Sequence, residues 1–236
     1  MTNDVLILVP TRNEVQNLKP LINKLLYNFP NSVYLFIDDS STDGTFENLN
    51  ELSVSNKQIQ VISRFGKEPN IASSYLLGYK FAQEKGFKYV GQMDCDGQHD
   101  VIDLKKIYDE KEHFDVVIGS RYVLNGKVIG WSRSRLLLSR VANFYLKVLF
   151  PSIPISDITS GIRLSKISAL DKIWNKSPKS KGFSFHAEST LIAHRLRFEI
   201  AEKPITFSPR SSGKSKMNLK RALESTYKFF IWRFRL

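Results

Sequence analysis

The sequence predicts an α/β protein with a mostly parallel, twisted sheet and helices on both of its faces. Short apolar runs alternate with segments of helical spacing as far as residue 118, which is the pattern of strands joined by crossover helices. Charged side chains also follow directly after five of the predicted strands, and they include Glu14, Asp39, Arg64, Asp96 and Arg121. In such sheets ligands bind beyond the carboxyl ends of the strands, so we expect one site at this edge.

The first strand is expected at residues 5–9, where an uninterrupted apolar run is typical of a strand buried on both faces. Four further strands are expected at 33–37, 59–62, 89–93 and 115–118. Apolar residues at helical spacing between 18 and 26 predict the first helix, and another helix is expected over 72–84. The polar turn at 38–44 is suited to cap the helix that follows it.

Residues 131–150 are expected to form a helix with an unusual distribution of polarity. Its polar positions step by three or four residues and so form one narrow face, made of Ser132, Arg135, Ser139, Asn143 and Lys147. The other positions are almost all apolar. Such a helix is either buried in the core or lies in a membrane interface. A further helix is expected over 183–197, and a strand over 199–207.

The chain of 236 residues carries a net charge of +12, which predicts an anionic partner. Nucleic acid, phosphorylated small molecules and an acidic membrane face all meet that description. Residues 219–236 form a basic tail in which aromatic rings alternate with Lys and Arg. That composition suits a membrane interface, and it equally suits packing onto a partner.

The single cysteine, Cys95, excludes an internal disulfide and suits a reducing compartment. Because it lies between two aspartates, its thiol is expected to be a small filler and not a nucleophile. The first residues do not resemble a signal peptide, and no apolar run reaches the ~18 residues of a spanning helix. We therefore expect a cytoplasmic protein that can lie on a membrane.

Asp94 and Asp96 follow the strand expected at 89–93, in a loop that Gly97 allows to turn and to which Gln98 adds an oxygen. Carboxylates at i and i+2 can converge on Mg²⁺, which takes one or two of them together with phosphate and water. As a loop carboxylate, Asp96 is expected to be exposed and to contribute little to stability. A calcium loop is excluded, because its sixth position is His99 and its twelfth is Lys105.

Several segments together resemble the family 2 glycosyltransferases of the GT-A fold, in the group of dolichol- or polyprenyl-phosphate sugar synthases. They lie in the order of that family at 9–14, 37–45, 93–99, 119–122, 157–163, 202–205 and 210–216. The resemblance implies a GT-A catalytic domain over 1–218, followed by the tail at 219–236. It also implies that C-terminal amphipathic helices, including 131–150, lie in the membrane interface.

The resemblance further implies a role for individual residues. The nucleotide sugar would be bound by Pro10, Thr11, Glu14, Asp39, Asp94, Arg210 and Lys216. A divalent metal, Mg²⁺ or Mn²⁺, would be bound by Asp94, Asp96 and Gln98. The acceptor phosphate would be bound by Arg121, Arg135 and Ser139, and the catalytic residues would be Asp96, Arg121 and Arg135. Arg12, where the family commonly has an aromatic residue, leaves the choice of nucleotide base open.

The implied reaction is the transfer of a sugar, most commonly mannose from GDP-mannose, onto a dolichyl or polyprenyl phosphate with inversion. A phosphate acceptor is already ionised near neutral pH, so it needs arginines to position it and no general base. The implied location is the cytoplasm, peripherally on the inner face of a membrane.

Two other functions remain open at this point. The same fold can transfer a sugar from a UDP-sugar to a glycan hydroxyl, which requires a carboxylate base; Asp100, Asp157 and Glu188 are candidates. A nucleic-acid-binding protein would explain the charge. Paired loop carboxylates would repel its phosphates, so we expect no nucleic-acid partner.

Overall fold

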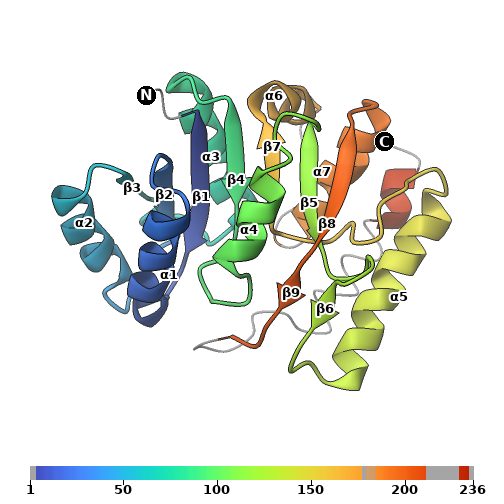
Figure 1. The fold of residues 1–236 in the computed structure, drawn as a ribbon, viewed down its shortest axis with the longest axis horizontal. Coiled ribbons are helices and arrows are strands. Elements are labelled where there is room, and N and C mark those ends of the chain that lie inside the picture. The colour runs from blue at the N-terminus through green and yellow to red at the C-terminus, as the bar shows by residue number, and fades with distance from the viewer. Residues whose placement is uncertain (1–3, 177–179, 181, 183, 211–228, 234–236) are drawn as a thin grey trace.

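The computed structural model describes residues 4–176, 180, 182, 184–210 and 229–233. Within them, a seven-stranded sheet has the order β3-β2-β1-β4-β7-β5-β8, and β6 and β9 form a separate two-stranded sheet (Figure 1). Every pair in the large sheet is parallel except those of β7, which confirms the mostly parallel α/β fold.

The first half alternates strand and helix as expected. Its elements are β1 (Val5–Thr11), α1 (Val15–Asn28), β2 (Val33–Asp38), α2 (Thr45–Ser55), β3 (Ile59–Ser63), α3 (Ile71–Glu84), β4 (Tyr89–Gln92), α4 (Val101–Tyr108) and β5 (Val116–Ser120). The sequence patterns did not assign α4, whose N-terminus is capped by the Asp100 carboxylate accepting the Ile102 N–H at 3.1 Å.

The second half contains two strands and one helix that the sequence patterns did not predict, at 127–128, 163–166 and 167–175. Its elements are β6 (Lys127–Val128), α5 (Arg133–Leu149), β7 (Arg163–Lys166), α6 (Ile167–Asn175), α7 (Ser184–Arg195), β8 (Ile200–Pro204) and β9 (Thr206–Phe207). β7 runs antiparallel between β4 and β5. Its sequence has a single apolar residue, Leu164, so no hydrophobic pattern marks it as a strand.

The strand expected over 199–207 is divided into β8 and β9, which pair with two different strands. Ile205 donates its N–H to the Ser120 carbonyl at 3.0 Å, and its own carbonyl accepts the Lys127 N–H at 2.9 Å. Residues before it pair with β5 and residues after it pair with β6.

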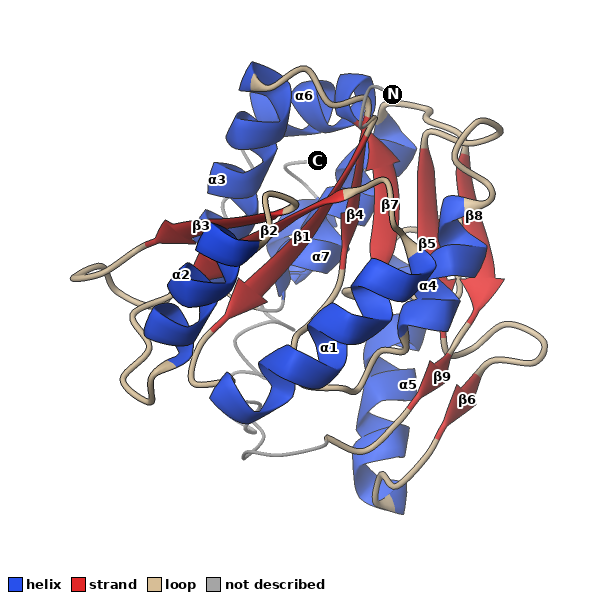
Figure 2. Ribbon diagram, turned by 60° about the vertical axis from the view of Figure 1, so that its left-hand side comes forward, coloured by secondary structure: helices blue, strands red, loops and turns tan. Residues whose placement is uncertain are grey.

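β1 and β2 are apolar up to their last residues because helices cover both faces of the sheet (Figures 1 and 2). Along β1, Val5, Ile7 and Val9 pack into one cluster with residues of α1 and α4. Leu6 and Leu8 point the other way and pack against α3. The carboxyl ends of β1, β2 and β4 therefore end at a common edge on a rigid core.

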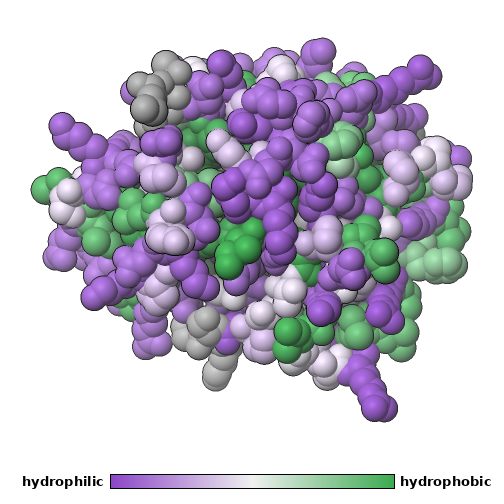
Figure 3. Space-filling model, in the orientation of Figure 1, coloured by the Kyte–Doolittle hydropathy of each residue, from purple (hydrophilic) through white to green (hydrophobic). Residues whose placement is uncertain are grey.

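α5 turns Asn143 and Leu146 toward the protein and exposes several apolar side chains on its other side. Asn143 is buried, accepts the Ile158 N–H at 2.8 Å and donates to Thr159 at 3.2 Å. Phe144 and Val148 are 69% and 60% exposed. Apolar side chains gather over α5 at the right of Figure 3, which excludes a core location for this helix.

Within the part of the chain that the structure describes, no helix combines the length and the apolar character that crossing a membrane requires. Residues 229–233 of the tail are helical, and Phe229 and Trp232 are buried in a cluster with Leu146 of α5 and Leu191 of α7. Phe230, beside them, is half exposed. Residues 229–233 thus pack beside α5.

Candidate active site

The loop after β4 places two carboxylates at the sheet edge. Gly97 has the positive φ of 76° that the turn requires. Asp96 accepts the Gln98 N–H through Oδ1 at 3.0 Å, and its Oδ2 lies 3.0 Å from Nη2 of Arg210. The expectation that Asp96 is exposed is wrong: it is 4% exposed because the loop folds back against the chain after β9.

The electrostatics of this loop favour a bound cation. Burial, and next the charge of Asp94, raise the pKa of Asp96. His99 Nδ1 lies 3.7 Å from Asp94 Oδ2, but burial lowers the pKa of His99 to about 4, so the imidazole brings no compensating charge at neutral pH. Arg210 supplies one cation for the two carboxylates.

The residues present fit a hard divalent metal ion. Asp94, Asp96 and Gln98 offer oxygen atoms, and Gln98 donates its Nε2 to the Ser208 carbonyl at 3.4 Å, which turns Oε1 the other way. No group of three or more His, Cys, Asp or Glu side chains with metal-binding geometry occurs among the described residues. A metal held here would therefore complete its coordination with ligand oxygens and water.

On the β1 side of this loop, the expected nucleotide-binding residues are held together by hydrogen bonds. Asp39 donates its N–H to the carbonyl of Thr11, next to Pro10 at the end of β1, at 2.9 Å. The Asp39 carboxylate pairs with Arg64 and accepts the Asn70 N–H at 2.7 Å. Glu14 donates its N–H to Thr45 at 2.9 Å. Lys216 lies outside the described residues.

On the β5 side, Arg121 is fixed by a buried carboxylate. Its Nε and Nη2 donate to Oδ2 and Oδ1 of Asp157, both at 2.7 Å, and Nη2 also donates to Thr159 at 3.1 Å. Arg121 was expected to bind the acceptor phosphate with two N–H groups, but its Nε and Nη2 donate to Asp157 instead. Nη1 is the nitrogen that remains for a ligand.

Arg135 and Arg121 lie over the Trp131 ring, with their guanidinium carbons 4.0 and 5.5 Å from its centroid. Burial, and then the charges of Arg210 and Arg121, lower the pKa of Arg135, which places three cations within electrostatic reach of one another. The third expected acceptor residue, Ser139, accepts a hydrogen bond from the Tyr122 hydroxyl at 2.7 Å. Three cations so close together can bind an anion.

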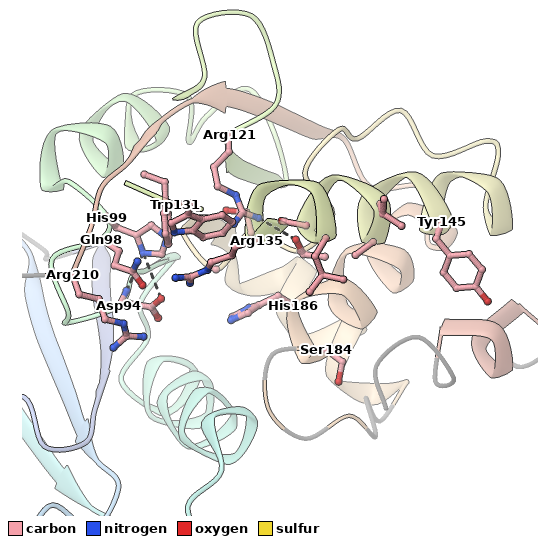
Figure 4. Close-up of a pocket in the computed structure, with 18 of the residues that line it drawn as sticks. Asp94, Gln98, His99, Arg121, Trp131, Arg135, Tyr145, Ser184, His186 and Arg210 are labelled. Carbon is pink, nitrogen blue, oxygen red and sulfur yellow. Dashed lines mark hydrogen bonds and ion pairs between the residues drawn. The ribbon is translucent and has the colours of Figure 1, made fainter. Parts of the chain in front are cut away.

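A cavity of about 360 Å³ joins the carboxylate loop to α5 (Figure 4). Six of the expected residues line it: Asp94, Gln98, Arg121, Arg135, Ser139 and Arg210. At the far end its wall is formed by Val141, Tyr145 and Phe229. The cavity is therefore charged at one end and mostly apolar at the other.

The carboxylates considered as a base for a hydroxyl acceptor all have structural partners. Asp100 caps α4, Asp157 pairs with Arg121, and Glu188 accepts the Ser180 N–H at 2.8 Å. Among the described residues that line the cavity, Asp94 alone carries a carboxylate. The geometry thus offers an anion site without a second acid.

Sequence patterns alone did not single out two residues of this region. Arg163 is buried in β7, where it donates to the Ser160 carbonyl and to Thr190 at 3.2 Å, and so ties the loop before β7 to α7. His186, in the first turn of α7, lines the cavity. Neither lies just after an expected strand, and the family resemblance gave neither of them a role.

This sheet, with a carboxylate loop after β4 and an arginine cluster beyond it, defines a glycosyltransferase of the GT-A fold. Solved structures agree: a complex of glucosyl-3-phosphoglycerate synthase from Mycobacterium tuberculosis with Mn²⁺, UDP and glucosyl-3-phosphoglycerate has a TM-score of 0.69. The match covers 98% of this chain and 80% of that chain at 14% identity, and so establishes the fold alone.

The chain belongs to glycosyl transferase family 2, whose sequence profile matches residues 6–174. Polyprenol monophosphomannose synthase of Mycolicibacterium smegmatis is 34% identical over 98% of this chain and 87% of its own length. Undecaprenyl-phosphate mannosyltransferase of Micrococcus luteus is 32% identical over 91% of this chain and 87% of its own length. These relatives confirm the polyprenyl-phosphate sugar synthase group that the motifs indicate.

Proposed function

We propose that this enzyme transfers mannose from GDP-mannose to a polyprenyl phosphate, with a divalent metal and with inversion at the anomeric carbon. The observation that carries the proposal is the cavity that joins Asp94 to the cluster of Arg121, Arg135 and Arg210 and whose described lining has no second carboxylate. The names of the two relatives support mannose as the sugar and a lipid phosphate as the acceptor.

The residues divide the work between the two substrates. Asp94, Asp96 and Gln98 would hold Mg²⁺ or Mn²⁺, which supplies charge stabilisation for the departing diphosphate. Arg210, now paired with Asp96, lies where it can bind the same diphosphate. An oxygen of the lipid phosphate attacks the anomeric carbon, the bond from that carbon to the diphosphate oxygen breaks, and GDP leaves.

Arg121 and Arg135 orient the acceptor. The Asp157 fork and the Trp131 ring fix the two guanidinium groups before the ligand arrives, so little reorganisation is needed on binding. Because the acceptor phosphate is ionised at neutral pH, transfer requires no proton acceptor from the protein. Preorganised cations thus replace the base that a hydroxyl acceptor would require.

We further propose that the enzyme works on the inner surface of a membrane. The exposed apolar side chains of α5 include Leu137, Phe144 and Val148, while the opposite side of the helix reaches the cavity through Arg135 and Ser139. An interfacial helix in this orientation lets the isoprenoid chain stay in lipid while its phosphate enters the site. The net charge of +12 favours anionic lipid.

A thermal-shift screen of GDP- and UDP-sugars with Mg²⁺ or Mn²⁺ tests the donor assignment, because a ligand that binds only the folded state raises its stability. We expect GDP-mannose to give the largest metal-dependent shift. A larger shift with a UDP-sugar would contradict the assignment of the donor.

A further inference from the structure

His186 lines the same cavity as the arginines. It is 3% exposed, and its ring packs edge-to-face on Tyr75 and Phe185 at centroid distances of 5.1 and 5.4 Å. Figure 4 shows the imidazole beneath the polar side of α5, turned toward Arg135 and Asp94 in that view. The roles proposed above leave this buried group unused.

The hydrogen bonds behind His186 determine which ring nitrogen carries the proton. Gln92 donates Nε2 to the Gly161 carbonyl at 3.0 Å, and its Oε1 accepts the Tyr79 hydroxyl proton, so its amide orientation is fixed. The same Nε2 lies 3.4 Å from Nδ1 of His186 and has a second hydrogen to donate. Nδ1 is therefore an acceptor, and the proton of the neutral ring is on Nε2.

Nε2 of His186 lies beside Gly161, and both residues line the cavity. A methyl group added to Gly161 would lie 3.3 Å from Nε2, so the glycine is what leaves this donor accessible. Among the residues that the structure describes, Nε2 contacts no acceptor, while His186 itself lines the cavity. Burial, and next the charge of Arg163, hold the pKa of His186 well below its ordinary value, so the ring stays neutral.

A neutral donor next to aromatic rings suits a sugar better than a phosphate. The anions of both substrates are matched by the metal site and by the arginines of the same cavity. Burial, and next the charge of Asp94, raise the pKa of Tyr75, the ring on which His186 packs, so the carboxylate loop lies within electrostatic reach of this ring. A sugar attached to a diphosphate at Asp94 would meet the wall of His186.

We propose that His186 binds the transferred sugar, donating Nε2–H to one of its hydroxyl oxygens. This assignment rests on the proposed function, since it takes the donor to be a nucleotide sugar bound at Asp94. The chemical class recognised is a neutral hexose, and the contact helps to set its orientation toward the acceptor phosphate.

Titration calorimetry with GDP and with GDP-mannose, in the presence of Mn²⁺, separates the sugar from the nucleotide. His186→Phe keeps the ring and removes the donor, Gly161→Ala covers the donor, and His186→Gln restores an N–H in nearly the same place. We expect the first two variants to bind GDP-mannose about 3- to 10-fold more weakly, the loss of one neutral hydrogen bond. All three should bind GDP within about twofold of the wild type, and His186→Gln should also retain GDP-mannose affinity to that extent.

His194→Gln is the matched control, because His194 lies on the same helix about 12 Å further along and bonds Ser152 at 3.1 Å. Equal losses for GDP and GDP-mannose, or full GDP-mannose affinity in His186→Phe, would overturn the assignment. If the KM rises for polyprenyl phosphate alone, His186 binds the acceptor and not the sugar, and the assignment is overturned. If the wild type binds neither GDP nor GDP-mannose, the proposed function itself is contradicted. If only the variants lose affinity, and only for GDP-mannose, the result supports the role of His186.

Discussion

Asp157 holds Arg121 with both carboxylate oxygens, at 2.7 Å from Nε and 2.7 Å from Nη2. The carboxylate is fully buried, and it also accepts the backbone N–H of Arg121 at 3.0 Å. Glu202 in turn accepts the N–H groups of Ser156 and Asp157 at 2.6 and 2.8 Å. The position of Arg121, which lines the cavity, is thus set by two acids that do not line it.

Asp157→Asn should therefore weaken use of the acceptor and lower stability. Breaking a buried ion pair costs about 3–5 kcal/mol, and the freed guanidinium loses its orientation. We expect the KM for polyprenyl phosphate to rise about 10-fold or more with a smaller change for the nucleotide sugar, measured by steady-state kinetics. Asp171→Asn, at an exposed position of α6, should change neither quantity. Loss of turnover with unchanged thermal stability would instead mark Asp157 as a base.

Asp96→Asn should abolish transfer while the fold survives. The substitution removes one of the two carboxylates that would hold the metal and leaves a side chain of the same shape in its buried position. We expect turnover to fall about 100-fold or more, because charge stabilisation of the leaving diphosphate is lost. Turnover with added Mn²⁺ and after chelation, combined with a thermal melt, makes the comparison. Rates near those of the wild type would contradict the metal assignment.

The exposed side of α5 should bind the enzyme to membranes. Phe144→Asp with Val148→Asp introduces two charges on that side without touching a residue that lines the cavity. We expect this variant to lose flotation with vesicles containing phosphatidylglycerol, while its affinity for GDP-mannose stays unchanged.

Val54→Asp provides the control for membrane binding, since Val54 is 88% exposed on α2 at the other end of the sheet. It should float as the wild type does. Flotation of the α5 variant would exclude this side of the helix as the membrane contact.

His186 should make the protein sensitive to mild acid. Its folded pKa is lowered from an ordinary value of 6.5, so unfolding at lower pH takes up a proton. The stability that the neutral ring contributes is present above that value and is lost as the pH falls below it, by about 1.4 kcal/mol per unit. His186→Gln has no such group, so its stability relative to the wild type should rise between pH 7 and pH 5. Urea titrations across that range measure the difference, and a constant difference would show that His186 is not held neutral.

The fold was predictable from the sequence where a strand is buried on both faces, because such a strand consists of apolar residues. Two such strands are β1 (Val5–Thr11) and β2 (Val33–Asp38), which lie between layers of helices. They are apolar up to their last residues, and the polar residues at their ends indicate the position of the site. Arg163–Lys166 is also a central strand, but it has mixed polarity because Arg163 bonds to α7 and Lys166 pairs with Asp115 at 3.2 Å. No periodicity reveals a strand of this kind.

The site was predictable in its residues and less so in its contacts. Asp94, Arg121 and Arg135 line one cavity, as the motifs suggest. The pair of Arg121 and Asp157 spans 36 positions of sequence, and the buried position of Asp96 depends on the chain after β9, which only the folded structure brings near. His186 lies in the first turn of α7, a buried helix, where the sequence cannot distinguish a core residue from a ligand-binding one.

The product formed from GDP-mannose is the most direct test of the proposed transfer to a polyprenyl phosphate. The purified protein, with Mn²⁺ and with either undecaprenyl phosphate in vesicles or free glycan acceptors, is assayed for transfer of labelled mannose into the lipid fraction. We predict a lipid-linked mannosyl phosphate that depends on Asp96 and Arg135. Transfer to a glycan hydroxyl, with none to the lipid phosphate, would contradict it.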